Sequence, residues 1–229
     1  MQNTYCAIIQ ARLGSSRLPL KSLVALHGIP IIDWVVNRVS TAKRLNKVLV
    51  AIPATDLDQA LGAHLTMRGI PYVAGSENDV LNRFYQAAKA VQARHIIRIC
   101  ADNPLIWGEA IDRLIDYYEQ TQPDYAYNHI PKGNRWPDGL GAEICSFALL
   151  EAMENKAKDA SEREHCMNYI WNHADSFSIK TFDPEEPWLC RPDIKLDIDT
   201  VEDYNRLAHC PLSIDIPIRQ LIDCFPKQS

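Results

Sequence analysis

Short apolar runs rich in β-branched and aromatic residues recur along the first half of the chain, and each ends at a polar or proline-containing segment. Such runs are typical of buried strands. They cover residues 5–10, 47–52, 70–73, 95–100 and 124–127. Apolar residues recur at helical spacing in residues 31–39, 56–68, 80–91 and 108–119, with Asp56 at an N-cap position. This alternation predicts a three-layer α/β fold with a mostly parallel sheet and helices on both faces.

Three polar segments follow the predicted strands. They are residues 14–21, 76–79 and 102–104. In sheets of this kind, ligands bind in the loops beyond the carboxyl ends of the strands. We therefore expect a ligand site where the three segments meet.

The first of these segments belongs to a longer loop, here called the basic loop (residues 11–21), which carries three fixed positive charges, Arg12, Arg17 and Lys21. Gly14 and the two serines after it favour a turn, and Pro19 excludes a helix through it. A loop rich in free backbone N–H groups and cations is suited to polyanions such as phosphates. The basic loop is predicted to hold a nucleoside triphosphate. The alternative is an exposed, solvated loop.

The second half of the chain has a weaker pattern. Residues 129–139 are too rich in Pro and Gly for a regular element, so this stretch is either a substrate loop or a connector. Two helices are predicted at residues 146–157 and 161–174, the second with a Ser161–Glu164 capping box. Residues 178–182 and 194–196 are expected to be strands, and Asp199 opens a late helix.

A bound triphosphate normally requires Mg²⁺, which prefers hard oxygen ligands. Asp102 directly follows a predicted buried strand, and Asp197 and Asp199 alternate in an extended segment, so that both carboxylates would face one side. Either Asp102 or Asp199 is equally readable as a helix N-cap.

Bulk properties restrict the class of protein. The chain of 229 residues fits one large domain, and its net charge of −5 argues against non-specific nucleic-acid binding. The seven cysteines show no Cys-x-x-Cys spacing, so neither a zinc site nor a disulfide framework is indicated. No signal peptide and no apolar run long enough for a membrane span is present, which favours the cytoplasm.

Several blocks resemble a known family. The N-terminal block Ala-Arg-x-x-Ser-Ser-Arg-Leu-Pro-x-Lys (residues 11–21) is similar to the signature of the CMP-sugar-acid synthetases, the acylneuraminate and 3-deoxy-manno-octulosonate cytidylyltransferases. The chain is still more similar to the SpsF-type cytidylyltransferase-like proteins of spore coat polysaccharide synthesis. That likeness involves blocks at residues 9–12, 75–83, 101–106, 137–140, 163–165 and 199–203.

The resemblance implies a single Rossmann-like nucleotidyltransferase domain over residues 1–229, with an inserted dimerisation or substrate flap at about residues 129–175. It implies a homodimer that transfers CMP from CTP to a sugar acid of the 2-keto-3-deoxy or nonulosonic type, releasing pyrophosphate. Carried over by position, Arg12 and Lys21 would be catalytic, and Asp102 and Asp199 would hold Mg²⁺.

Further site residues are assigned on the same basis. The nucleotide would contact Gln10, Ala11, Arg12, Gly14, Ser15, Arg17, Lys21, Ser76 and Asp79. The base would lie near Ser76, Glu77 and residues 53–55. The acceptor would be oriented by Asp138, Glu143, Arg163 and His165. An arginine suits the carboxylate of the acid because its fork is bidentate, whereas His165 is equally readable as a helix-start or interface residue.

The sequence departs from the family pattern at Leu20, Asn82 and Gly141, where relatives often have Gly, Asp and Asp. A leucine adopts positive φ only at a cost, so the approach of the backbone to the phosphates is in question. Two rival functions stay open. One is a glycosyltransferase using a nucleotide-sugar donor, for which the candidate Asp-x-Asp motif is Asp197 to Asp199, late in the chain. The other is a non-catalytic nucleotide-binding module.

Overall fold

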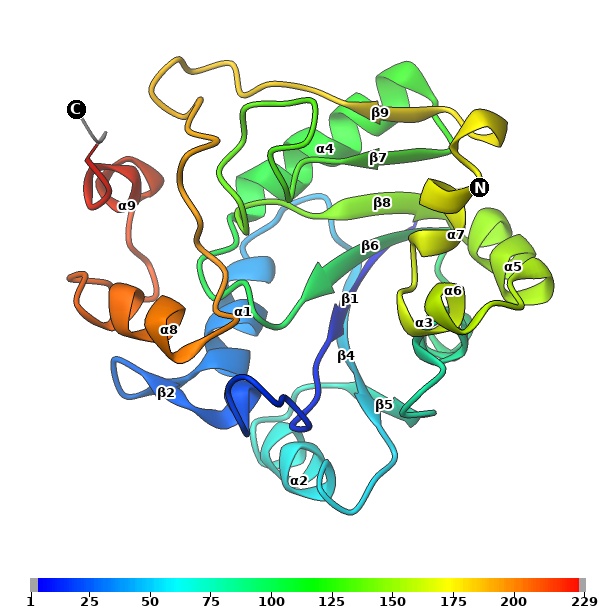
Figure 1. Cartoon of the computed structure of the whole chain (residues 1–229), viewed down its shortest axis with the longest axis horizontal. Helices are drawn as coiled ribbons and strands as arrows, with labels where there is room; N and C mark the ends of the chain where they lie inside the picture. The colour runs from blue at the N-terminus through cyan, green and yellow to red at the C-terminus, as the bar shows by residue number, and fades with distance from the viewer. Residues whose placement is uncertain (1–3, 227–229) are drawn as a thin grey trace.

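A seven-stranded sheet forms the centre of the computed structural model, which describes residues 4–226 (Figure 1). Its strands, in spatial order, are β5 (Tyr72–Gly75), β4 (Lys47–Pro53), β1 (Tyr5–Gln10), β6 (His95–Cys100), β8 (Glu143–Ser146), β7 (Tyr125–Tyr127) and β9 (Ile179–Thr181). All strand pairs are parallel except those made by β8, which runs antiparallel to both β6 and β7. The predicted mostly parallel sheet is confirmed.

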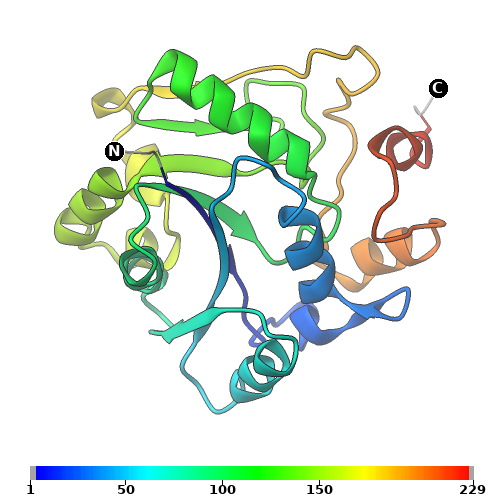
Figure 2. The same cartoon turned by 180° about the vertical axis from the view of Figure 1, so that it is seen from behind.

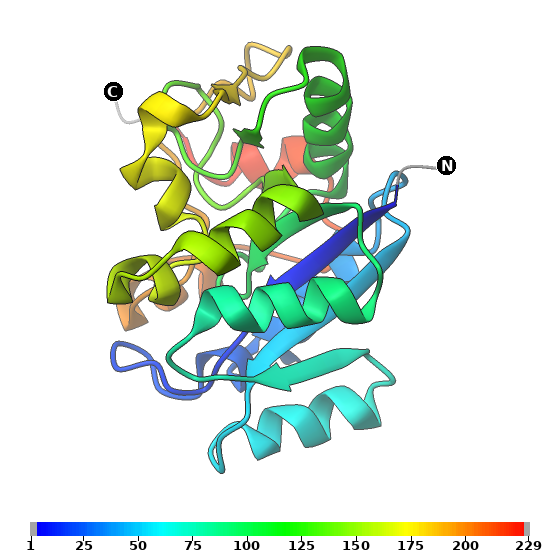
Figure 3. The same cartoon turned by 90° about the vertical axis from the view of Figure 1, so that its right-hand side faces the viewer.

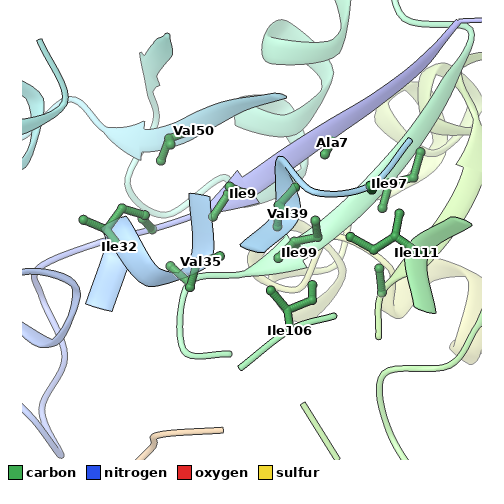
Figure 4. Packing of buried hydrophobic residues seen from close by; sticks show 14 of the residues in the cluster. Ala7, Ile9, Ile32, Val35, Val39, Val50, Ile97, Ile99, Ile106 and Ile111 are labelled. Carbon is green, nitrogen blue, oxygen red and sulfur yellow. The ribbon is translucent and has the colours of Figure 1, made fainter. Parts of the chain in front are cut away.

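Helices cover both faces of the sheet, as Figures 2 and 3 show from two further directions. The helices are α1 (Ile31–Val39), α2 (Gln59–Met67), α3 (Val80–Ala90), α4 (Gly108–Thr121) and α5 (Phe147–Lys156). On one face, apolar residues of α1, α2 and α4 pack on alternate strand residues such as Ile9 and Ile97. Figure 4 shows Val35 and Val39 of α1 against these strands. On the other face, α3 and α5 pack against Ile8 and Ile96. Burying each such side chain contributes about 1.5–3 kcal/mol to the stability of the fold. Because helices pack on both faces of the sheet, the predicted three-layer arrangement is confirmed.

The strand β8 is absent from the predicted elements. It is four residues long and begins with a charged residue, Glu143, so its pattern is too short and too polar to signal a strand. Because β8 belongs to the main sheet, part of the segment predicted as an inserted flap is sheet structure. The dimerisation or substrate role of the remainder stays a prediction.

Several predicted boundaries are wrong. The helix assigned an Asp56 cap starts at Gln59, because residues 56–58 form a turn. The predicted helix 161–174 is divided into α6 (Ala160–Glu164), α7 (Asn168–Asn172) and the 3₁₀ turn η2 (Ala174–Ser176). Ser161 lies inside α6 and caps nothing, so the capping box with Glu164 does not form. Residues 194–196 form only a single bridge, between Lys195 and Asp138.

The C-terminal part packs on a third apolar cluster that contains the buried Trp34 and Trp136. It includes α8 (Val201–Ala208) and α9 (Ile218–Asp223), of which α9 was not predicted. A short hairpin of β2 (Ala25–Leu26) and β3 (Ile29–Pro30) packs on the same cluster. The segment before α8, drawn in orange in Figure 1, thereby passes beside the basic loop. Among the described residues, no helix has the length and apolar character needed to cross a bilayer.

Candidate active site

The basic loop leaves the end of β1 and folds around the buried Leu13. The Leu13 backbone N–H donates to Asp58 Oδ1 (2.8 Å), and its carbonyl accepts from the backbone N–H groups of Ser15 (2.8 Å) and Leu20 (3.2 Å). The Ser22 hydroxyl donates to the Arg12 carbonyl (3.2 Å). The loop is thus held mainly through its backbone groups, with help from the side chains of Asp58 and Ser22.

Leu20 adopts the left-handed conformation, with φ 56° and ψ 22°, and caps the 3₁₀ turn η1 (Lys21–Leu23). This is the position at which the resemblance predicts glycine. Because a non-glycine residue pays about 1–2 kcal/mol for this conformation, the chain keeps the glycine-type backbone geometry at an energetic cost. The Leu20 side chain is 46% exposed, so apolar burial compensates little of it.

Lys21, which η1 places at the inner end of the loop, lies between two carboxylates from distant parts of the chain. Its Nζ is 3.2 Å from Asp102 Oδ2 and 3.4 Å from Asp199 Oδ1, and it donates to the Ile198 carbonyl (2.7 Å). The Arg17 guanidinium also reaches Asp199 Oδ1 (3.0 Å). The structure therefore brings together two predicted cations and both predicted metal ligands.

Neither aspartate caps a helix. Asp102 lies in the turn after β6, where its carbonyl accepts from the Ile198 N–H (2.8 Å), and α4 has Trp107 at its N-cap. The N-cap of α8 is Thr200, which forms a capping box with Asp203. The side chains of Asp102 and Asp199 are thus left to face the basic loop.

A cavity of about 300 Å³ lies between the basic loop and the ends of β1 and β6. It is lined by Gln10, Ala11, Arg12, Gly14, Ser15, Ser16, Arg17, Lys21, Ser22, Arg98, Cys100, Ala101, Asp102 and Asp199. Every residue predicted to be catalytic or to bind metal lines this cavity, as do seven of the nine residues predicted to contact the nucleotide. A polar space of this kind, with both cations and carboxylates, suits a metal-bound polyphosphate.

The other two predicted nucleotide residues, Ser76 and Asp79, do not line this cavity. Asp79 caps α3 by accepting from the Asn82 backbone N–H (2.9 Å). Its other carboxylate oxygen accepts two hydrogen bonds (2.5 and 3.0 Å) from the guanidinium of Arg163, which lies 84 residues away in the sequence. Ser76 Oγ accepts from the Asp79 N–H (3.1 Å), and the fully buried Arg83 donates to the Ser76 carbonyl. In this structure these residues shape the second loop.

A neighbouring cavity of about 320 Å³ opens at the carboxyl end of β4 and is lined by residues that include Pro53, Ala54 and Thr55. These are the residues predicted to lie near the base. Ser76 and Glu77 are not among its lining residues.

The predicted acceptor residues are dispersed. The guanidinium of Arg163 is held by Asp79 and by the carbonyl of Glu154 (2.9 Å), and His165 is exposed at the end of α6. Glu143 is buried and bonds to Arg98 and to the Tyr125 hydroxyl.

Two acceptor-side carboxyl groups have displaced pKa values. Burial would raise the pKa of Glu143, but Arg98, His129 and Tyr125 outweigh it and lower that pKa to about 2. Asp138 is half-buried, and burial followed by the charge of Asp197 raises its pKa to about 6. Asp138 thus lies in a region where negative charge is crowded.

Asp197 and Asp199 bind different cations. Asp197 contacts Lys195 (3.3 Å), whereas Asp199 contacts Lys21 and Arg17. The two carboxylates therefore do not form the shared site that their alternation suggested.

The remaining departures from the family pattern have local explanations. A Cβ at Gly141 would lie 2.2 Å from Asn128 Oδ1 and 2.4 Å from the Asn128 carbonyl, so an aspartate does not fit. The Asn82 amide donates to Glu154 Oε1 (2.8 Å), a bond that an ionised aspartate would replace with repulsion.

Comparison with protein families gives one match over nearly the whole chain. The model described as "Cytidylyltransferase" matches residues 6–216. The chain belongs to the cytidylyltransferase family. It is a nucleotidyltransferase, in agreement with a cavity that combines phosphate-binding cations and two carboxylates.

Curated relatives of this cytidylyltransferase include two that align over most of both chains. An uncharacterized protein of Methanocaldococcus jannaschii is 34% identical over 96% of this chain and 89% of its own. The spore coat polysaccharide biosynthesis protein SpsF of Bacillus subtilis is 32% identical over 90% and 85%. A 3-deoxy-manno-octulosonate cytidylyltransferase of Bdellovibrio bacteriovorus is 35% identical over 48% of this chain and 44% of its own.

Solved structures agree in fold. A cytidylyltransferase from Leptospira borgpetersenii superposes with a TM-score of 0.86 at 27% identity, covering 97% of this chain and 93% of that one. The CMP:2-keto-3-deoxy-manno-octonic acid synthetase complexed with CTP gives 0.66 at 16% identity, covering 90% and 97%. Rv0371C of Mycobacterium tuberculosis, solved with manganese, gives 0.61 at 15% identity, covering 90% and 98%. The last two similarities concern the fold alone.

Proposed function

We propose that this cytidylyltransferase transfers CMP from CTP to a hydroxyl group of a sugar acid of the 2-keto-3-deoxy or nonulosonic type, with release of pyrophosphate. The observation that carries the proposal is the meeting of Arg12, Arg17 and Lys21 with Asp102 and Asp199 in one cavity. The names of the SpsF and 3-deoxy-manno-octulosonate cytidylyltransferase relatives support a role in the synthesis of surface polysaccharide.

The residues present fit a divalent cation. Asp102 and Asp199 converge on one positive charge, the Lys21 ammonium, which supports a cation site at this point. Within residues 4–226, no group of three or more His, Cys, Asp or Glu side chains could hold a metal ion, so a metal at this point would have two protein carboxylates and would take its other ligands from elsewhere. Two carboxylates completed by substrate phosphates and water are the usual environment of Mg²⁺. Bound there, Mg²⁺ would supply neutralisation of the phosphate oxygens.

The protein's own groups act on the phosphates. The acceptor hydroxyl attacks the α-phosphorus and releases its proton to water. The bond from that phosphorus to the oxygen bridging to the β-phosphate breaks, and pyrophosphate leaves. Arg12 and Lys21 stabilise the negative charge that grows on the α-phosphate and on the leaving pyrophosphate, and Arg17 supports the loop side. Asp138, whose pKa is raised in part by the charges of Asp102 and Asp199, orients the acceptor hydroxyl.

The assembly and location carry over as part of the proposal. We assign a homodimer in the cytoplasm, with residues 161–171 of the predicted flap as the contact surface. Within one chain, Trp171 already packs on Tyr125 and Tyr127, with ring centroids 5.7 and 5.3 Å away. Tyr169, stacked on His173, is therefore the aromatic side chain of this segment to test for a dimer contact.

Pyrophosphate release tests the function. The protein is incubated with Mg²⁺, each of the four ribonucleoside triphosphates and a panel that includes 3-deoxy-manno-octulosonate and N-acetylneuraminate. We expect acid-dependent pyrophosphate with CTP, and a loss of at least about 100-fold in Asp102→Asn and Asp199→Asn. Asp175→Asn, a change at an exposed aspartate outside the cavity, serves as the matched control. Nucleotide diphosphate released from a nucleotide sugar, without pyrophosphate, would instead establish the glycosyltransferase function, and binding without any turnover the non-catalytic one.

A further inference from the structure

One arginine of the cavity has no role in the proposed function so far. Arg98 lies on β6 directly opposite Glu143 of β8, and its side chain, 16% exposed, lines the cavity floor. Arg163, the cation first expected to bind an acid, is occupied by Asp79 and Glu154. Arg98 is therefore the cation to consider on the acceptor side.

The guanidinium of Arg98 is held in place by the side chains of Glu143 and Gln10. Its Nη1 donates to Glu143 Oε2, and its Nη2 donates to Gln10 Oε1 (3.3 Å). The other oxygen of Glu143 accepts from the Tyr125 hydroxyl and lies 3.5 Å from His129 Nε2. With 4% exposure, the Glu143 side chain itself is closed off from the cavity.

These contacts leave donor capacity on the cavity side. An arginine has five N–H donors, and the two contacts use one hydrogen on each terminal nitrogen. A guanidinium has two edges that each present a parallel pair of N–H bonds, and a carboxylate accepts such a pair in bidentate fashion. The Nε–H of Arg98, which contributes to one of these edges, has no partner among the described residues. Because Glu143 and Gln10 already immobilise the Arg98 guanidinium, binding a ligand to it would cost little additional conformational entropy.

The order of strands places Arg98 on the side away from the proposed base. The second cavity lies at β4, the basic loop follows β1, and Arg98 stands on β6 next to β8. Base, phosphates and acceptor would then follow one another along the sheet edge. An in-line displacement needs the attacking hydroxyl on the side opposite the leaving pyrophosphate, which the basic loop holds.

We infer that Arg98 binds the carboxylate of the acceptor acid and thereby selects acids over neutral sugars. The inference rests on the proposed function for its substrate class. Glu143 and Tyr125 act as positioning residues, because they hold the guanidinium without reaching the cavity.

Binding and kinetics test this together. Calorimetry is performed on the protein saturated with CTP without metal, so that no turnover occurs, using 3-deoxy-manno-octulosonate, N-acetylneuraminate and the C1 alcohol of each. We expect wild type to bind at least one acid and to lose at least about tenfold in affinity for its alcohol, because a hydrogen-bonded charge pair is removed. Arg98→Lys should bind the acid at least about tenfold more weakly than wild type does, and its affinities for acid and alcohol should be similar. Its affinity for CTP should stay within about twofold of the wild-type value. In turnover, the acid KM should rise in Arg98→Lys.

Controls separate the possible failures. Arg113→Lys, at a paired arginine away from the cavity, should leave both affinities unchanged, and melting temperatures verify that the variants are folded. Guanidinium added to Arg98→Ala should partly restore binding of the acid, which a purely structural role would not predict. Equal wild-type affinity for acid and alcohol, absence of binding of either acid, or a parallel loss of CTP affinity in Arg98→Lys would overturn the inference. Acid binding with the expected discrimination but no pyrophosphate release would refute the proposed function and leave the carboxylate site standing.

Discussion

Replacing Asp203 with asparagine should destabilise the protein at neutral pH and much less in acid. Asp203 Oδ2 accepts from Lys195 Nζ (2.8 Å) and from the backbone N–H groups of Asp199 and Thr200 (both 3.1 Å). Burial would raise the pKa of Asp203, but these donors outweigh it and lower the pKa from 3.8 to about 2. At about 1.4 kcal/mol per pKa unit, the charged form contributes about 2 kcal/mol.

The sign of the pH dependence follows from the lowered pKa. The stabilisation is complete above the unfolded pKa near 3.8 and is lost as the pH falls towards about 2. In urea unfolding at pH 7, Asp203→Asn should therefore lower the midpoint by roughly 1 M, for a slope of about 2–3 kcal/mol per M. The difference between variant and wild type should shrink as the pH is lowered from 5 to 3.

Glu202→Gln is the matched control. It makes the same chemical change one residue earlier in the first turn of α8, at an exposed position. Only a helix-dipole contribution of about 0.3–1 kcal/mol is lost there. If Asp203→Asn is no more destabilising than this control at pH 7, or if its effect persists unchanged at pH 3, the network that holds Asp199 is not the stabilising one described above.

Three further substitutions test the site and its supports. Lys21→Ala should reduce turnover at least about 100-fold with the fold intact by circular dichroism, and near-normal turnover would place the triphosphate elsewhere. Leu20→Gly should stabilise the protein by about 0–1 kcal/mol in urea unfolding, because the strain removed from the left-handed conformation exceeds the entropy that glycine adds to the unfolded chain. The variant should also retain or improve CTP affinity, and marked destabilisation would contradict this argument. Gly141→Ala should cost about 1–3 kcal/mol by overpacking against Asn128, whereas Gly14→Ala, with no atom within 4 Å of its Cβ, should cost less; equal effects would refute the packing argument.

The pattern of the chain was sufficient to predict the central parallel strands, and it also predicts a phosphate-binding role for the basic loop. Apolar β-branched runs indicated β1, β4 and β6 because these strands are buried on both faces. Three cations beside a turn glycine indicated a phosphate loop because few other roles concentrate charge there. Both signals arise from residues that are close together in the sequence, so they can be recognised without knowing the fold.

The parts that could not be predicted depend on long-range contacts. Lys21 meets Asp102 and Asp199 across 81 and 178 residues of sequence, and no periodicity encodes such a meeting. The resemblance predicts an acceptor contact for Arg163 and a nucleotide contact for Asp79, yet the two side chains bind each other across 84 residues. Arg98 could have been noticed as a charge within an apolar strand, which is costly unless the charge is paired or functional.

The fate of α-phosphate label tests the central claim most directly. CTP labelled at the α-phosphate is incubated with the protein, Mg²⁺ and the acid panel, in parallel with CTP labelled at the γ-phosphate. Cleavage between the α- and β-phosphates at the cavity of Lys21, Asp102 and Asp199 predicts α label in a sugar–CMP product and γ label in pyrophosphate, both lost in Lys21→Ala. The γ label appearing as inorganic phosphate, or the α label remaining in CTP with every acid, would contradict the account.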